Sequence, residues 1–182
     1  MPNLTDNALI QIFLPIINAA LVVDGFTGVT VQQAAQPTMQ GSPLAPTVYF
    51  YKVGMKRYGF LGRSDKWDNI DDQMDHNESQ FYESTWRVQV MVLQNPATPN
   101  QYTASDLADE VASIMQSSNT LDILNTNGIG ILRITDIVNP YFLDDRDNYE
   151  AIPSFDFTLV YENQRLSLDP IISQFTAGIY PI

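Results

Sequence analysis

The sequence has no cysteine, one histidine, and nine lysine and arginine residues against 21 aspartate and glutamate residues. Without cysteine, disulfides and thiolate metal sites are excluded, and the chain suits a reducing compartment. The formal net charge of −12 gives a surface that repels nucleic-acid phosphates and anionic lipids. We therefore expect no specific binding of nucleic acid and no association with membranes.

The common signatures of nucleotide binding and nucleophilic catalysis are also absent. The chain contains no P-loop, no G-x-G-x-x-G and no G-x-S-x-G. The glycines of residues 127–131 (NGIGI) follow a predicted helix rather than open one, so they suit a helix end better than a phosphate site. We predict a protein that is not an enzyme and needs no cofactor. A carboxylate-based hydrolase stays as a less favoured alternative, because a chain rich in aspartate never excludes it.

The only histidine, His76, lies in an acidic stretch at residues 64–79, where metal binding has to be weighed. Carboxylates beside one imidazole suit hard divalent ions. The stretch lacks the central glycine of an EF-hand calcium loop. We interpret it as a solvated acidic loop and predict no metal site.

One apolar run, residues 9–23, needs an explanation. It is shorter than the roughly 20 residues of a membrane span, Gln11 and Asn18 interrupt it, and no lysine or arginine precedes it. Its apolar residues have helical spacing, and Thr5 is placed to cap the start. This pattern predicts a buried helix that ends near Asp24.

The remaining elements follow from similar patterns. Thr103 and Asp106 have the spacing of a capping box at the start of a second helix. In chain order we expect a strand at 28–35, a hairpin at 48–63, a long strand at 81–93, the second helix at 103–117 with a further turn at 121–124, and strands at 129–138 and 155–161. Strands and helices do not alternate strictly, which predicts an α+β fold. We expect a largely antiparallel sheet with two main helices packed on it, and a long hairpin and acidic loops that project. Residues 1–166 form a single domain in this prediction, followed by a C-terminal extension at residues 167–182.

Residues 47–94 carry the most distinctive pattern. An aromatic-rich strand at 48–53, a turn at Gly54 and a partner strand at 55–63 predict the hairpin. After the acidic loop, the strand at 81–93 would reach roughly 40 Å at about 3.3 Å per residue, beyond the usual strand length. Such a strand extends past its own core and pairs with another chain, or it bends at a bulge.

Charge is unevenly distributed in this segment. Five of the nine cations lie in or next to the predicted hairpin, and ten of the 21 acids lie in two predicted loops, 65–78 and 144–150. The cations form either an ordinary solvated strand face or a basic hairpin that meets the acidic loops of a neighbouring copy. Trp67 is either a lid folded back on the chain or an anchor for a partner. The candidate interface residues are Lys52, Lys56, Arg57, Arg63, Trp67, Asp71, Asp72, Asp75, Asp144, Asp145 and Asp147.

Taken together, these segments resemble a known family. The order of elements, with VYFYKVGMKRYGFLGR at residues 48–63, an acidic loop, QFYESTWRVQVMV at 80–92 and FDFTLVYEN at 155–163, resembles the tail terminator or neck proteins of tailed bacteriophages. The resemblance spans residues 4–163 and is strongest to the family of contractile-tailed phages. It rests on pattern and carries no residue-level binding role.

The resemblance implies a structural virion protein. Members of that family assemble into a six-membered ring that caps the tail tube and sheath and joins the tail to the head connector. The expected partners are therefore further copies of the chain, tail tube and sheath proteins, and the connector protein, with DNA passing through the lumen. The implied location is the tail or neck of the virion, assembled in the host cytoplasm. Another connector or tail-tube component is the alternative within the same particle.

Overall fold

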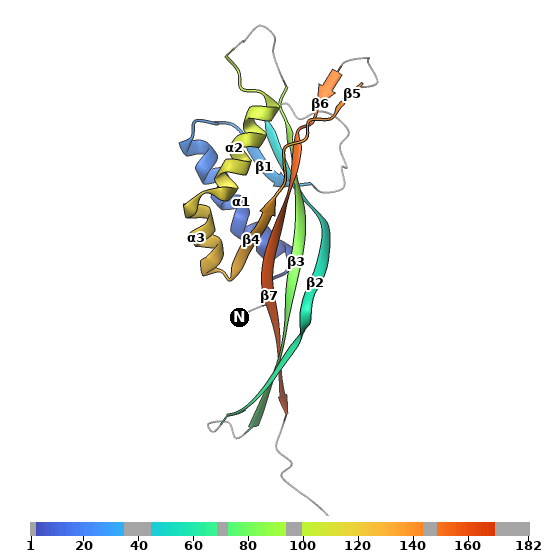
Figure 1. Ribbon diagram of the computed structural model, residues 1–182. Coiled ribbons are helices and arrows are strands. Elements are labelled where there is room, and N and C mark those ends of the chain that lie inside the picture. The colour runs from blue at the N-terminus through green and yellow to red at the C-terminus, as the bar shows by residue number, and fades with distance from the viewer. Residues whose placement is uncertain (1–2, 35–44, 69–72, 94–99, 144–148, 170–182) are drawn as a thin grey trace, which may run out of the picture.

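The computed structural model describes residues 3–34, 45–68, 73–93, 100–143 and 149–169 (Figure 1). Its main sheet has the strand order β1-β2-β3-β7-β4, and the helices lie together on one face of it. The elements are α1 Asp6–Val23, β1 Thr30–Gln33, β2 Thr47–Asp68, β3 Gln73–Met91, α2 Ala104–Gln116, α3 Ser118–Thr126, β4 Ile129–Ile134, β5 Tyr141–Leu143, β6 Tyr149–Ala151 and β7 Ser154–Asp169. β1 pairs with β2 in parallel, whereas β2–β3, β3–β7 and β4–β7 are antiparallel. The α+β class and the largely antiparallel sheet are confirmed.

The helices begin and end where their capping residues predict. The Thr5 side chain accepts a hydrogen bond from the Ala8 N–H, and α1 ends at Asp24. Thr103 and Asp106 form a reciprocal capping box at the start of α2. The turn from α3 to β4 uses Gly128 at φ 72°, a conformation that glycine adopts without strain.

α1 is a core helix, although its length and composition would also allow it to cross a membrane. Six of its residues are buried against the sheet: Leu9, Ile10, Phe13, Ile16, Ile17 and Leu21. The ring of Phe13 lies 5.4 Å from that of Phe50, 5.5 Å from Trp86 and 5.7 Å from Phe157, measured between centroids. This aromatic cluster joins α1 to β2, β3 and β7 and forms the centre of the core.

The other face of the sheet is not covered by helices (Figure 1). There the Arg87 guanidinium of β3 donates hydrogen bonds of 2.6 and 3.0 Å to the Asp156 carboxylate of β7. This bidentate contact raises the pKa of Arg87 further above its ordinary value and fixes the register of the two central strands.

Three strands continue well beyond the helices and form a projection that we call the arm (Figure 1). It consists of residues 53–68 of β2, 73–83 of β3 and 162–169 of β7, paired in the order β2-β3-β7. Because no helix covers it, both faces of the arm are exposed to solvent along most of its length. The arm is the most distinctive feature of the fold.

Two predictions about this segment are wrong. Gly54 does not lie at a turn: β2 runs from Thr47 to Asp68 without reversing, and Gly54 follows a bulge at Val53. Residues 64–79 are not a loop either, because their described part belongs to β2 and β3. Glycine and polar residues usually indicate turns and loops. Here they lie in strands that have no buried face, so the pattern that marks a strand is missing.

Smaller corrections apply elsewhere. Residues 121–124 belong to a separate helix, α3, and β4 ends at Ile134, with only an isolated bridge at Val138. Part of the predicted loop before the last strand forms β5 and β6. β7 extends to Asp169, so the first residues of the expected C-terminal extension pair with β3 in the arm.

Candidate protein-interaction site on the arm

The edge strand of the arm contains a wide bulge. Tyr58 pairs with Phe81 and Gly62 pairs with Ser79, so the β2 residues 59–61 face only Gln80 on β3. Gly59 has φ 72°, a conformation that disfavours other residues. The Gln80 side chain donates a hydrogen bond of 2.7 Å to the carbonyl oxygen of Tyr58, next to the point where the bulge interrupts the ladder. The bulge is therefore a supported feature rather than a defect in pairing.

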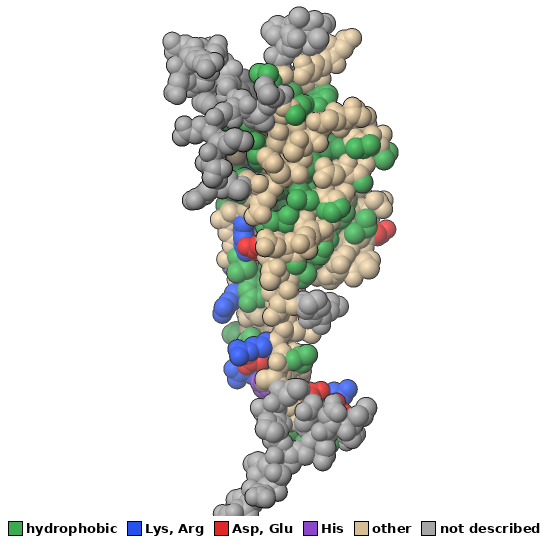
Figure 2. All heavy atoms as spheres, turned by 180° about the vertical axis from the view of Figure 1, so that it is seen from behind, with side chains coloured by type: hydrophobic (Ala, Val, Ile, Leu, Met, Phe, Trp, Pro, Cys, Tyr) green, Lys and Arg blue, Asp and Glu red, His purple; other side chains and the backbone are tan. Residues whose placement is uncertain are grey.

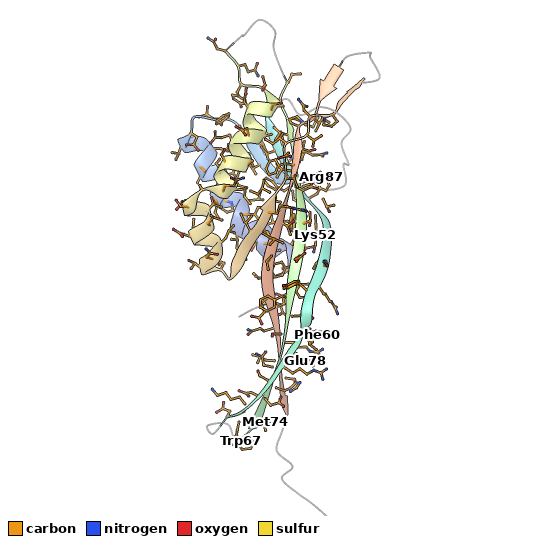
Figure 3. The ribbon with its side chains drawn as sticks, in the orientation of Figure 1. Lys52, Phe60, Trp67, Met74, Glu78 and Arg87 are labelled. Carbon is orange, nitrogen blue, oxygen red and sulfur yellow. The ribbon has the colours of Figure 1, made fainter. Side chains whose placement is uncertain are left out.

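The bulge places Phe60 entirely in solvent. Its side chain is 99% exposed, the highest value among the large apolar residues of the described chain. Burying a phenylalanine contributes about 1.5–3 kcal/mol relative to leaving it in water. A supported bulge that displays such a residue is typical of an anchor for another protein. Figure 3 shows Phe60 between Lys52 at the root of the arm and Trp67 at its tip.

A cross-strand charge network lies between the bulge and the tip. Glu78 of β3 faces Arg63 of β2, with a nitrogen–oxygen distance of 3.4 Å, and Arg165 is opposite Glu78 in the β3–β7 ladder. Arg63 and Arg165 are both exposed. Because these groups are solvated, we expect the ion pair to contribute at most about 1 kcal/mol to stability. These side chains link neighbouring strands of the arm, and both arginines stay exposed on its surface.

His76 lies one step closer to the tip in the same network. Its imidazole is hydrogen-bonded to the Asp65 carboxylate, and its other ring nitrogen lies 3.7 Å from Glu78. The bond to Asp65 and the charge of Glu78 raise the pKa of His76 above its ordinary value of 6.5. His76 therefore links carboxylates of β2 and β3. The described residues contain no group of three or more His, Asp or Glu side chains arranged to hold a metal ion.

An apolar pair lies next to the last pair of the β2–β3 ladder, at the tip of the arm. Trp67 of β2 and Met74 of β3 are direct partners in the ladder, with 44% and 38% of their surfaces exposed. Trp67 was expected in a loop, but it belongs to a strand. Its position far from the helices argues against a lid over the core (Figure 3), and a role as a partner anchor stays a prediction.

The root of the arm is tied to the beginning of α1. The Lys52 ammonium lies 2.6 Å from the Asp6 carboxylate. The Leu4 N–H donates to the Asn163 side-chain oxygen at 2.8 Å, and the Asn163 amide nitrogen donates back to the Leu4 carbonyl at 3.4 Å. Lys52 is thus an internal brace in the free chain.

The other candidate interface residues are not arranged as expected. Lys56, Arg57 and Arg63 are exposed on β2, but Asp75 belongs to the same arm and pairs in register with Lys66. The cations and these carboxylates therefore do not form a separate hairpin and loop. The remaining candidates, Asp71, Asp72, Asp144, Asp145 and Asp147, lie outside the described residues.

The helices have a charge pattern that the sequence analysis missed. No lysine or arginine precedes Lys52, and none lies between Arg87 and Arg133, so α1, α2 and α3 carry carboxylates and no cations. In Figure 2 the cations accordingly gather along the arm. Counting charge by region rather than for the whole chain would have revealed this separation.

Comparison with known proteins agrees with a role in a larger assembly. The family model of the E217 gateway protein gp29 matches residues 8–168, which include nearly all of α1, the whole of α2 and α3, and nearly the whole sheet. Among curated proteins, none matches the chain. Because the family match covers most of the chain, this protein belongs to the E217 gateway protein gp29 family, whose members are phage structural proteins of the virion head–tail junction.

Proposed function

We propose that this protein is a ring-forming tail terminator at the phage neck, which caps the tail tube and sheath and joins them to the head connector. The observation that carries the proposal is the arm. It projects from a compact α+β body and displays Phe60 and Trp67 to solvent. Such an arm is suited to reaching another subunit.

The charge distribution supports a channel for DNA. A helical layer with carboxylates and no cations repels phosphates, so DNA passing such a surface is not retained. The word gateway in the family name supports a position on the path between head and tail. The partners in this proposal are further copies of the chain, the tail tube and sheath, and the connector.

The first test is the mass and shape of the purified protein. Size-exclusion chromatography with light scattering should give a closed oligomer, and negative-stain images should show rings with a central opening. Adding purified tail tubes should place rings at tube ends. Chains that stay monomeric at high concentration, both alone and with tubes, would count decisively against the proposal.

The same preparation separates the tail terminator from another connector or tube component of the particle. Rings found only at tube ends support a terminator, whereas rings that bind isolated connectors but not tubes support a connector component. Polymerisation into long tubes would instead identify a tube protein.

A further inference from the structure

A hollow lies on the edge of the arm opposite Phe60. β4 pairs with β7 only as far as Ile129 opposite Tyr161, and β7 then continues without β4. Where β4 begins, the structure has a hollow of about 440 Å³, lined by Leu4, Phe81, the α3–β4 turn at residues 126–128, and residues 160–162 and 164 of β7. Its volume lies within the range of sites that hold small organic groups, about 300–1,000 Å³, so it is large enough for a benzyl side chain.

The hollow and Phe60 lie at the same level along the arm. The bulge that displays Phe60 faces Gln80 of β3, and Gln80 pairs with Asn163 of β7. The hollow is lined by β7 residues on both sides of Asn163, from Val160 to Gln164. One edge of the three-stranded arm therefore carries an exposed aromatic group, and the other edge carries a hollow, at matching positions.

Because Phe60 and the hollow lie at the same level on opposite edges of the arm, a head-to-tail contact between copies is favoured. A rotation about an axis roughly parallel to the arm keeps every group at its own level, and it brings the β2 edge of one copy beside the β7 edge of the next. A contact between two different surfaces of one chain is heterologous, and it closes into a ring when the rotation allows.

Charges next to the two features are complementary. Lys56 and Arg57 precede the bulge on β2 and are exposed. The complementarity is confined to this side of the bulge, because Arg63, which follows it, lies level with the cation Arg165 of β7. Glu162 lies at the hollow on β7. Opposite charges around an apolar anchor select the partner and its register.

We propose that the hollow is occupied by Phe60 of a second copy of this chain, with Lys56 of that copy beside Glu162. This inference rests on the proposed ring and names the contact that closes it. The contact would bury Phe60, the most exposed of the large apolar residues in the described part of the chain.

Cross-linking can test the contact directly, because the chain has no native cysteine. In a Leu61→Cys, Gln164→Cys double variant, Phe60 is intact and the new thiols flank the contact. A short bis-maleimide should give a ladder of covalent oligomers that ends at the ring size. Adding Phe60→Ala should slow cross-linking at least about tenfold, equivalent to about 1.4 kcal/mol per contact. A control double variant with Trp67→Cys at the tip and Gln164→Cys, in which Leu61 is kept, should give no ladder.

Two further comparisons make the result specific. Leu132→Ala, at a residue of β4 that is 60% exposed and away from the hollow, should leave assembly of the wild-type chain unchanged. Lys56→Glu and Glu162→Lys should each weaken assembly, and the double reversal should restore it. If rings form but the Leu61→Cys, Gln164→Cys variant gives no cross-linked ladder, or if rings tolerate Phe60→Ala, this contact is overturned and the proposed function is left intact. A wild-type chain that forms no oligomer, alone or with tubes, rejects both.

Discussion

Replacing either of two phenylalanines by alanine should lower stability strongly at one position and hardly change it at the other. Phe13 is fully buried, and its ring contacts Phe50, Trp86 and Phe157. Phe60 is 99% exposed. Phe13→Ala removes an aromatic group from the centre of the core and leaves a cavity, whereas Phe60→Ala removes a group that touches little in the free chain.

The magnitudes follow from burial. Truncating a buried phenylalanine lowers the free energy of unfolding by about 3–5 kcal/mol. For a chain of this size that corresponds to a fall in Tm of about 6–20 °C. The exposed substitution should change the free energy of unfolding by no more than about 0.5 kcal/mol.

Urea unfolding followed by tryptophan fluorescence provides the assay, because Trp86 lies in the core beside Phe13. Measurements belong at concentrations where the chain is monomeric, since association stabilises the folded state by mass action. A loss above about 1.5 kcal/mol for Phe60→Ala would mean that its ring is buried in the isolated chain, and the argument for an anchor would fail. A loss below about 1 kcal/mol for Phe13→Ala would contradict the assignment of the core.

Three other predictions concern the bulge, the histidine and a helix cap. Gly59→Ala should cost about 1–2 kcal/mol in urea unfolding because φ is 72° there, whereas Gly54→Ala, with φ outside that region and open space around it, should be nearly neutral; equal effects would contradict the bulge. Because the bond to Asp65 raises the pKa of His76, the stabilisation of the tip is complete below about pH 6.5 and is lost as pH rises through the raised value. NMR titration of the single imidazole and hydrogen exchange at the tip measure this, and a pKa at or below the ordinary value refutes it. Thr103→Ala should lower the free energy of unfolding by about 0.5–2 kcal/mol. Thr103→Ser should keep most of the stabilisation by the cap, and equal free energies of unfolding for the two variants would contradict the role of the Thr103 hydroxyl.

The body of the fold could be predicted because one face of each element is buried there. Along β3, Ser84, Trp86, Val88 and Val90 occupy alternate positions, and all four are buried. The side-chain hydrogen bonds of Thr5 and Thr103 fixed the starts of α1 and α2. These signals are local, and tertiary structure does not override them.

The arm could not be predicted in the same way. Its two faces are both exposed, so the alternation of apolar and polar residues that marks a strand is lost after Lys52. Gly54, Gly59 and Gly62 lie close together in the sequence and indicate turns, yet they serve two irregularities of one continuous strand. At Gly62 a Cβ atom would come within 2.7 Å of the Ser79 hydroxyl oxygen, a restriction that depends on the partner strand. The interface candidates that the structure describes in this segment were therefore placed in the wrong local structure, and their role in an interface stays a prediction.

The ties at the root of the arm make it a lever rather than a loose appendage. Lys52 holds Asp6 at the first residue of α1, and Asn163 holds Leu4 just before it. A force that bends the arm relative to the body has to strain these contacts first. Mechanical load from a neighbouring subunit would therefore enter the body at the N-terminal end of α1, next to the aromatic core that Phe13 centres.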